Sequence, residues 1–465
     1  MNGGDGYQSY AKNSSFQKGA IEVAKEIIEE EIRNKLDTEK LSSSSTNIIC
    51  IADFGCSTGP NTFHAMQIIV ETIKKKIEKQ LSVSHQMPEF QVFFNDRISN
   101  DFNTLFASLP QDRQYHAAGV PGSFHDCQFP KASLHFAYSS FTLHWLSEVP
   151  QEVADPLSPA WNKGKILYYG DKNEVFNAYA AQFAKDLDSF LKARAQELVF
   201  GGLMALLVCS ESNHTKNIST ITFPSFELLG SCLMDLAKEG LFDTAKVDSF
   251  NMPLYFPTPN ELKALIEKHK DFSIERMEIL SNPPKRFTTP DSKSFAMFLR
   301  AWIEGLLRTH FGNAVMDKLF RRYEQKVEES KLLSNPNENS MMTFVHLKDG
   351  VVPFHPGSQF YRSQSLSSSD KQYGPPSAEP APSEGARPRV LAPPETSVSS
   401  VAAGMAIADG ASNVRPSIVI EPKSITPDTA TTFRQHKSLA PHHALRVIGF
   451  AVSSLTTPSK CHDCH

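Results

Sequence analysis

Apolar and polar positions near the start of the chain follow two kinds of pattern. Apolar residues recur every three or four positions over residues 20–36 and 69–81, which predicts two amphipathic helices. A Ser-rich turn at residues 42–45 follows the first of them. The next segment, residues 48–52, is a short and continuous apolar run bounded by turn-forming residues. Such a run is typical of a strand that is buried on both faces, as in a parallel sheet.

The same rhythm continues along the chain. A long helix is expected at residues 174–198, and further strands at residues 90–94, 134–138, 203–208 and 343–347. Alternating strands and helices predict a parallel sheet with helices on both faces. Four later segments have helical spacing with few strands between them: residues 222–240, 259–270, 293–309 and 312–331. They predict a helical cap over the carboxyl edge of the sheet, where open α/β folds bind ligands.

Residues 351–465 differ from the rest in composition. They hold 14 of the 30 prolines and only six aromatic residues, and they show no sustained helical or strand period. Such a segment buries too little apolar surface to offset the entropy of the chain. We therefore expect one globular unit over residues 1–349 and a disordered tail over residues 350–465. The last five residues, from Cys461 to His465, spell C-x-x-C-H, which in such a tail is interpreted as a chance match to haem or zinc motifs.

The composition of the whole chain excludes several classes of protein. A net charge of −4 provides no basic surface for nucleic acid or an anionic membrane. No apolar run reaches the ~18 residues that a membrane span needs, and the first residues form no apolar signal segment. Seven scattered cysteines do not make a disulfide framework. We therefore expect a cytoplasmic protein.

A glycine turn follows the first predicted strand. The strand ends at Asp53, and the turn from Gly55 to Gly59 leads into the next helix. Glycine lets the backbone approach a ligand, and a helix N-terminus favours anionic groups. A dinucleotide fold is disfavoured because the G-x-G-x-x-G spacing is absent. A serine hydrolase with Ser57 in a G-x-S-x-G turn remains an alternative, although the turn follows the first strand and no H-G-G-G segment accompanies it.

Two carboxylates favour a third interpretation, a pocket for S-adenosylmethionine. Asp53 ends the first strand and Asp96 ends the next, so a parallel sheet brings both to one edge. The first carboxylate can pair with the ammonium group of the ligand, and the second can accept hydrogen bonds from both ribose hydroxyls. Either residue alone is better explained as a helix cap or a turn acid. Their joint placement favours the pocket.

In their order along the chain, these and further motifs resemble the plant SABATH family of S-adenosylmethionine-dependent carboxyl methyltransferases. The resemblance spans residues 1 to about 348 and rests on residues 1–4, 9–14, 51–62, 94–96, 100–103, 119–124, 139–140 and 145–147. It implies an α/β fold with a Rossmann-like methyltransferase sheet and a mostly helical cap. The cap elements are expected mainly within residues 150–195 and 211–335.

The resemblance also implies roles for single residues. The residues implied to contact the methionine side of the cofactor and its ribose are Tyr10, Ser14, Asp53, Asn61, Asp96 and Arg97. Those implied to contact the adenine are Ser123 and Phe124. The substrate carboxylate is expected at Gln17 and Trp145, with His144 beside them. The acid pocket is expected to be shaped further by Phe141, Phe226 and Tyr255. Some members bind magnesium, and the residues that would hold it here are Asn162, Asp248, Phe250 and Asn251.

Four sites depart from the family pattern. Arg97 stands where many members have leucine, and it adds a polar group at the ribose or adenine edge. Phe141 replaces a frequent tyrosine and removes a hydroxyl from the pocket. His144 stands where salicylate-type members have methionine, which disfavours a salicylate specialist. Asp126-Cys127 replaces a common Gly-Arg pair in the adjoining loop.

The reaction implied by this family is an in-line attack of a carboxylate oxygen on the sulfonium methyl group, which gives a methyl ester. A carboxylic acid with a pKa near ~4 is already ionised at neutral pH, so no general base is needed. Alignment in a dry pocket would then supply the rate. Two alternatives stay open, an N-methyltransferase of the xanthine or caffeine type and a catalytically silent small-molecule binder. The expected partners are a small carboxylic acid and a second copy of the chain, without nucleic acid or membrane.

Overall fold

The computed structural model describes residues 1–37, 47–80, 86–170, 172–211, 221–280, 291–334 and 341–350. The expected Ser-rich turn at residues 42–45, the tail from residue 351 onward and its C-x-x-C-H end lie outside these ranges. No helix within them is both long and apolar enough to cross a lipid bilayer.

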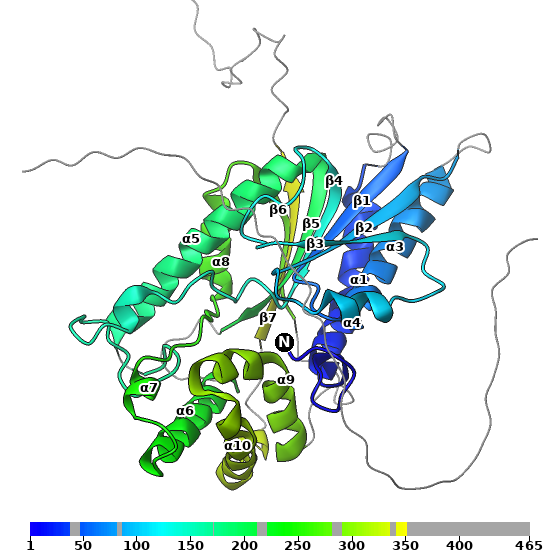
Figure 1. Cartoon of the computed structure of the whole chain (residues 1–465). Coiled ribbons are helices and arrows are strands. Elements are labelled where there is room, and N and C mark those ends of the chain that lie inside the picture. Colours follow the sequence, from blue (N-terminus) through cyan, green and yellow to red (C-terminus); the bar gives the residue numbers. More distant parts are fainter. Residues whose placement is uncertain are drawn as a thin grey trace, which may run out of the picture. The chain divides into compact units, whose positions relative to one another are not determined.

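A seven-stranded sheet organises the described residues (Figure 1). In chain order its strands are β1 (Ile48–Phe54), β2 (Glu89–Asp96), β3 (His116–Pro121), β4 (Leu134–Ser140), β5 (Leu198–Ser210), β6 (Phe272–Leu280) and β7 (Met341–Asp349). Their order across the sheet is β3-β2-β1-β4-β5-β7-β6. The first five strands in that order run parallel, which confirms the α/β prediction.

The sheet differs from the sequence-based expectation at both edges. β3 and β6 were not predicted, because neither strand has a buried apolar run. β3 consists of exposed and half-buried residues, and β6 is half-buried through its middle. The last predicted strand exists as β7, but it runs antiparallel to both β5 and β6. The apolar run of β7 is buried like that of a parallel strand, so burial alone does not indicate strand direction.

Helices cover both faces of the sheet (Figure 1). One face packs against α1 (Ser15–Lys35) and α3 (Asn61–Gln80), which bury their apolar stripes on β1 and β2. The short α4 (Phe102–Ala107) lies on the same side. The other face carries α5 (Asn173–Glu197) and α8 (Pro259–Glu267), and Phe190 of α5 meets Phe54 of β1 edge-to-face at 6.1 Å. Residues 150–195 were expected to hold cap elements, but α5, most of which lies within them, packs partly on the sheet.

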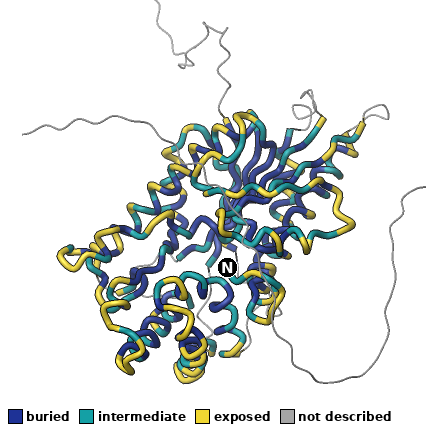
Figure 2. Tube along the Cα trace, in the orientation of Figure 1, coloured by how far each residue is buried: buried dark blue, intermediate teal, exposed yellow. Residues whose placement is uncertain are grey.

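The remaining helices form a separate group beside the carboxyl ends of the strands (Figure 1). This cap consists of α6 (Thr222–Lys238), α7 (Ala245–Asp248), α9 (Ser292–Phe311) and α10 (Met316–Ser330). Short 3-10 turns accompany the elements at Tyr10–Lys12, Gln151–Val153, Asn313–Val315 and Leu332–Ser334. Figure 2 shows two buried zones, the sheet with its facing helices and the inner side of the cap.

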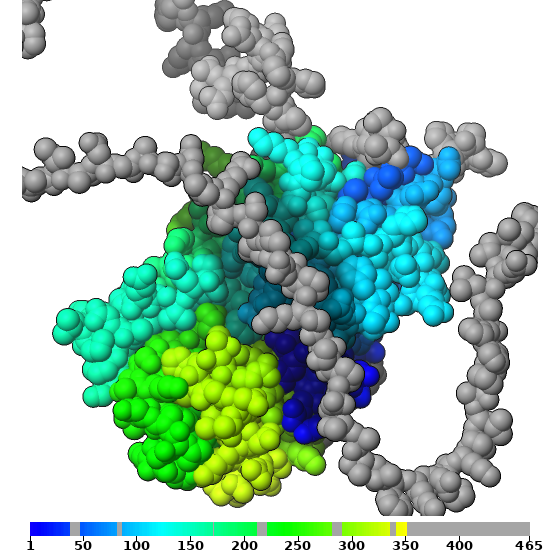
Figure 3. Space-filling view, viewed as in Figure 1, coloured from blue at the N-terminus to red at the C-terminus, as the bar shows by residue number. Residues whose placement is uncertain are grey.

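The N-terminal segment connects the cap to the sheet. The backbone N–H of Asn2 donates to the carbonyl of Ala301 in α9 at 2.7 Å, and its side chain donates to Glu304 at 2.7 Å. The N–H of Gly4 donates to the carboxylate of Asp101, which caps α4, at 3.0 Å. In Figure 3 this segment (dark blue) lies between the yellow-green cap helices and the sheet. It therefore covers the region where cap and sheet meet.

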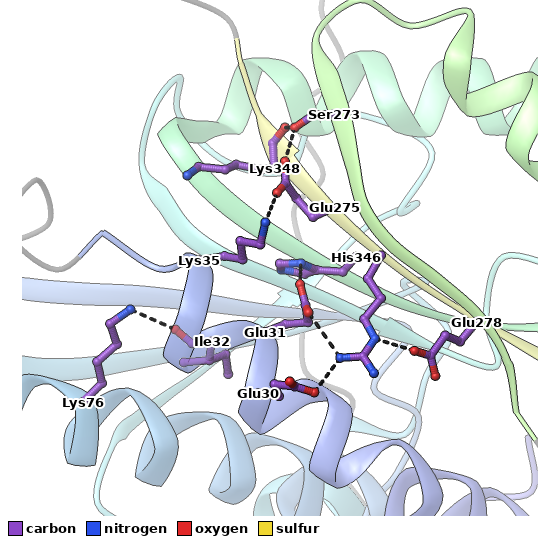
Figure 4. A network of polar contacts seen from close by, with 11 residues as sticks. Glu30, Glu31, Ile32, Lys35, Lys76, Ser273, Glu275, Glu278, His346 and Lys348 are labelled. Carbon is purple, nitrogen blue, oxygen red and sulfur yellow. Dashed lines mark hydrogen bonds and ion pairs between the residues drawn. The ribbon is translucent and has the colours of Figure 1, made fainter.

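A polar network attaches α1 to the antiparallel edge of the sheet (Figure 4). Glu31 of α1 lies 2.8 Å from Nδ1 of His346 in β7 and 3.4 Å from the guanidinium of Arg276 in β6. Arg276 also pairs with Glu30 at 2.6 Å. Burial lowers the pKa of His346, although the contact with Glu31 raises it in part. Gln17, a candidate site residue, lies near the start of α1. The network therefore helps to hold Gln17 in place.

Candidate active site

The carboxyl end of β1 is a tight glycine turn. Gly55 has a φ of +91°, and a Cβ at this position would clash with the side chain of Thr142. The N–H groups of Gly55 and Cys56 both donate to the carbonyl of Asn95 at the end of β2, at 2.8 and 3.0 Å. Only glycine meets both the backbone and the space requirement. The turn thereby holds the ends of β1 and β2 together.

Asp53 lies inside this turn as a buried carboxylate. It is 3% exposed and accepts a hydrogen bond from the hydroxyl of Thr62 in α3. The pKa of Asp53 is raised to about 7, mainly by burial and in part by the nearby Asp96, while the hydrogen bond from Thr62 lowers it in part. No cationic side chain of the described residues pairs with it. A ligand that brings a positive charge would therefore stabilise the ionised form.

Asp96 ends β2 next to the same turn. Its two carboxylate oxygens accept the backbone N–H groups of Ser57 and Arg97, both at 2.8 Å. Burial is the largest cause of its raised pKa, while these two hydrogen bonds lower it in part. Asp53 and Asp96 thus lie at the ends of adjacent parallel strands, as the sequence predicted. Each oxygen of Asp96 retains a lone pair for a ligand donor.

The loop after β3 lies beside Asp96. The N–H of Gly122 donates to the carbonyl of Asp96 at 2.9 Å, which brings Ser123 and Phe124 to this edge. The buried guanidinium of Arg194 in α5 holds the carbonyl of Phe124 at 2.7 Å. Ser123 and the side chain of Arg97 are exposed there. Arg97 contributes its backbone N–H to the position of Asp96.

The start of α1 supplies the opposite wall. The side-chain amide of Asn61, the first residue of α3, donates to the carbonyl and to the hydroxyl oxygen of Ser14, both at 3.0 Å. This contact joins α3 to the beginning of α1, one turn before Gln17. A narrow cavity of about 30 Å³ results, lined among others by Tyr10, Gln17, Asp53, Asn61 and Phe141. The structure thus brings together the residues expected around the methionine side of the cofactor.

A second and larger cavity, of about 270 Å³, lies between this wall and the cap. Four of the residues expected around the substrate line it, which are Gln17, Phe141, His144 and Trp145, and Phe226 lines it from α6. Tyr10, Gln17 and Phe141 line both cavities. The two cavities therefore share a wall, and ligands in them would lie against each other.

His144 is the one histidine in the described lining of the second cavity. It is 5% exposed and stacks on Phe256 at a centroid distance of 5.5 Å. Its backbone carbonyl accepts the N–H of Tyr255 at 2.9 Å. Burial lowers the pKa of His144 to about 3, so its ring is neutral at physiological pH. A neutral imidazole can position a ligand by hydrogen bonding, and it adds no positive charge to the cavity.

Tyr255 does not line either cavity, in contrast to the role implied by the resemblance. Its hydroxyl bonds both carboxylate oxygens of Glu261 at 2.8 and 2.9 Å, and its ring packs against Tyr168 and Phe183. Successive residues of an extended segment point to opposite sides. The neighbouring Phe256 therefore faces the cavity instead.

Several lining residues were not identified from the sequence. They are Phe16 on α1, Ser225 on α6, Phe256, and the α9 residues Phe295, Phe298, Leu299 and Trp302. The α9 residues are spaced i, i+3, i+4 and i+7, which is the spacing of an ordinary core-facing stripe. The number of aromatic residues in that stripe was the one available signal, because large rings also line ligand pockets.

The residues expected to hold magnesium lie together but satisfy one another. The side-chain amide of Asn162 donates to Oδ1 of Asn251 at 2.8 Å, and Oδ1 of Asp248 accepts the N–H of Gly164 at 2.9 Å. Phe250 packs on Phe311, 5.0 Å between ring centroids. Magnesium requires a near-octahedral set of oxygens, usually with one or two carboxylates. This cluster, with one carboxylate and its amides bonded to each other, does not fit that requirement as it stands. Across the described ranges, no three His, Cys, Asp or Glu side chains gather as a metal site.

Comparisons with known proteins agree on one relationship. A family model described as SAM-dependent carboxyl methyltransferase matches residues 1–349. Loganic acid O-methyltransferase of Catharanthus roseus is 46% identical over 332 residues, covering 71% of this chain and 88% of the relative. Farnesoic acid carboxyl-O-methyltransferase of Arabidopsis thaliana is 41% identical, covering 71% and 92%. A solved loganic acid methyltransferase with S-adenosylhomocysteine superimposes with a TM-score of 0.71 at 42% identity, covering 76% of this chain and 100% of that one.

Proposed function

Since this chain belongs to the SABATH family of S-adenosylmethionine-dependent carboxyl methyltransferases, we propose that its two adjoining cavities hold the methyl donor and a small carboxylic acid. The observation that carries this proposal is the shared wall of Tyr10, Gln17 and Phe141. Methyl transfer requires the acid oxygen and the methyl carbon to be in contact, and adjoining cavities satisfy that requirement. The product is the methyl ester of the acid.

The groups at the narrow cavity and at the edge beside Asp96 match those of S-adenosylmethionine, which when bound supplies an electrophilic methyl group on a sulfonium. The cavity itself, of about 30 Å³, would take in only part of this ligand, and the rest would lie along the edge. Asp53 is buried and has no cationic partner among the described residues, so it would accept the ammonium group. Asp96 would accept the ribose hydroxyls with its remaining lone pairs. Ser123 and Phe124, held beside Asp96, would face the adenine. Tyr10, Ser14 and Asn61 complete the wall around the methionine part.

The substrate carboxylate would lie at Gln17 and Trp145. Both side chains line the larger cavity, and each has an N–H donor that makes no hydrogen bond to another described residue. Two such donors fix the carboxylate while one oxygen remains directed at the shared wall. The acid is already ionised at neutral pH, so the reaction proceeds without a base. His144 would orient the acid as a neutral ring.

A panel of acids with purified protein tests this function. Incubation with S-adenosylmethionine and single carboxylic acids, followed by mass spectrometry, should reveal a methyl ester with a mass increase of one methylene. Xanthines belong in the same panel, because Paraxanthine methyltransferase 2 of Arabidopsis thaliana is 39% identical to this chain. Products methylated only on xanthine nitrogen would overturn the proposal. Cofactor binding without transfer to any acid would instead indicate a silent binder.

Cofactor affinity should depend on pH through Asp53. The carboxyl has a pKa of about 7 in the ligand-free protein, and the cationic ligand favours its ionised form. Binding should therefore release protons, and the affinity should fall as the pH decreases from about 8 to about 6. Calorimetry in buffers of different ionisation enthalpy measures the protons released. The Asp53→Asn variant should lose this pH dependence, and a variant that keeps it would contradict the assignment.

We propose that residues 1–349 form the complete catalytic unit. The family model ends at residue 349, and β7, the last described strand along the chain, ends at Asp349. A chain that stops at residue 350 should remain soluble, and its kcat and KM should stay within about twofold of those of the full chain. Loss of activity or solubility on truncation would show that the tail takes part in folding or catalysis.

Two finer expectations are also proposed, the first from the family resemblance and the second from the scattered cysteines of the sequence. The protein is proposed to form a homodimer, which light scattering of the purified chain would measure. It is proposed to act in the cytoplasm, which a fluorescent fusion would locate. Magnesium has no part in the proposed reaction, because its expected ligands Asn162 and Asn251 bond each other.

A further inference from the structure

Two charged side chains near the end of α5 lie outside both cavities and are completely buried. Arg194 and Glu197 each have a side chain with 0% exposure, and Nε of the arginine donates to Oε2 of the glutamate at 2.7 Å. Neither residue lines the narrow or the larger cavity. Removing an ion pair from water is costly, and two apolar side chains of similar volume often stabilise a fold at least as well. Stability alone therefore does not account for this pair.

The guanidinium of Arg194 holds the first half of the β3–β4 loop, defined here as residues 122–129. One of its nitrogens donates to the carbonyl of Phe124 at 2.7 Å, and another donates to the carbonyl of Asp126 at 2.9 Å. The donors of a guanidinium form a planar and rigid fork. Two carbonyls bonded to that fork are therefore fixed relative to each other.

The carboxylate of Glu197 holds the second half of the same loop. Its Oε1 accepts the backbone N–H groups of Gln128 and Phe129, the latter at 2.9 Å. The side-chain amide of Gln128 in turn donates to the carbonyl of Ser123 at 2.8 Å. Hydrogen bonds to an ionised acceptor are stronger than those between neutral groups. The ion pair thus fixes four backbone groups of the β3–β4 loop, and through Gln128 it also holds Ser123.

Arg194 also contacts the end of β1. Its guanidinium carbon lies over the ring of Phe54, 3.8 Å from the ring centroid, where the cation is attracted to the face of the ring. Phe54 directly follows Asp53 in β1. One rigid group therefore sets the spacing between the β3–β4 loop and the strand end that carries Asp53.

We propose that Arg194 and Glu197 are positioning residues for the methyl donor. They hold Ser123 and Phe124 in the conformation that receives the adenine before the cofactor arrives. Binding then does not have to order the β3–β4 loop, and the cost of such ordering is not subtracted from the affinity. The inference rests on the proposed function, since the adenine is assigned to this loop there.

Replacing the pair by apolar side chains tests this role. In the double variant Arg194→Met/Glu197→Leu, the β3–β4 loop loses its hydrogen bonds to α5, and no unpaired charge stays buried. The Kd of S-adenosylmethionine, measured by calorimetry, should rise by about tenfold or more, because binding must then order the loop. At saturating cofactor, kcat and KM for the acid esterified best by the wild-type chain should stay within about threefold.

A matched control lies on the exposed side of the same helix. Lys192 and Asp188 form an ion pair at 2.7 Å with side chains that are 64% and 44% exposed. The double variant Lys192→Met/Asp188→Leu removes the same two kinds of charge from α5, and it should leave the Kd of S-adenosylmethionine within about twofold, since exposed pairs contribute little. Circular dichroism and thermal denaturation show whether each variant is folded.

The split between Kd and kcat distinguishes positioning from a purely structural role. A loss of stability lowers the folded fraction and hence the apparent kcat, whereas the folded molecules keep their cofactor affinity. An unchanged Kd in folded Arg194→Met/Glu197→Leu would therefore overturn the inference, whether or not kcat falls. A rise in Kd that the Lys192→Met/Asp188→Leu control shares would overturn it as well.

A single substitution decides the question if that double variant does not fold. Arg194→Lys keeps a positive charge against Glu197, but one ammonium group cannot reproduce the fork that holds two carbonyls, so the Kd should rise by about fivefold. An unchanged Kd in this variant would overturn the inference and leave carboxyl methylation intact. Failure of the wild-type chain to bind S-adenosylmethionine, or to esterify any acid, would instead refute the proposed function.

Discussion

Replacing Trp145 with alanine is expected to lower kcat for the preferred acid by about 100-fold, because the carboxylate would lose a contact that aligns it with the methyl group. The dissociation constant of S-adenosylmethionine should stay within about threefold. Trp145 lines the larger cavity but not the narrow one. Its indole N–H would hold the carboxylate, so the loss should appear in the transfer step. Single-turnover kinetics and calorimetry measure the two effects separately.

Two further variants make the Trp145 prediction specific. Trp145→Phe keeps an aromatic ring against Trp302 and removes the N–H, so a similar loss would identify the hydrogen bond as the cause. Trp161→Ala removes the same side chain from a position that lines neither cavity, and it should leave kcat unchanged. If Trp145→Ala abolishes cofactor binding instead, the residue belongs to the cofactor site and the assignment is wrong.

Replacing Asp96 with asparagine should have the complementary effect. The affinity for S-adenosylmethionine should fall by about 10- to 100-fold, because hydrogen bonds to a charged acceptor contribute about 1.5–3 kcal/mol. An amide also places a donor against the N–H of Ser57 or Arg97, which the carboxylate accepts. At saturating cofactor, kcat should change by less than about tenfold, since Asp96 does not line the acid cavity.

The control for Asp96 is a carboxylate with no site role. Asp112 is exposed in the turn before β3, and Asp112→Asn should leave cofactor affinity unchanged. Thermal denaturation of both variants separates a folding defect from a binding defect. An unaltered cofactor affinity in a folded Asp96→Asn protein would exclude the ribose role.

The parallel strands and the edge of the sheet that would bind the ligand could be predicted from the sequence, because a buried apolar run that ends in a carboxylate has few alternative explanations. The buried run before Asp53 indicates a central strand, and the run before Asp96 indicates its neighbour. In a parallel sheet both carboxyl ends must meet at one edge, and the register pairs Asp53 with Phe94. The helices were predicted for the same reason, since α1 and α3 bury regular stripes.

The cap side of the site could be predicted only in outline. Phe298 and Trp302 follow the spacing of a helix that packs on a core, and nothing in that spacing distinguishes a core from a cavity wall. The direction of Tyr255 depends on its bonds to Glu261, which no local pattern encodes. β6 escaped prediction because Arg276 and Glu278 place charges on a strand that otherwise lacks a buried apolar run, and Arg276 pairs with Glu30 of α1.

The wall formed by Tyr10, Gln17 and Phe141 has a consequence for how such a protein can diversify. A substitution in that wall alters the environment of two ligands at once, so it tends to change methyl-donor use together with acid use. Positions on α6 and α9 face the acid cavity alone. Selection for a new acid can therefore act on these helices without cost to the invariant cosubstrate. Libraries built to retarget the enzyme should vary the cap and leave the wall untouched.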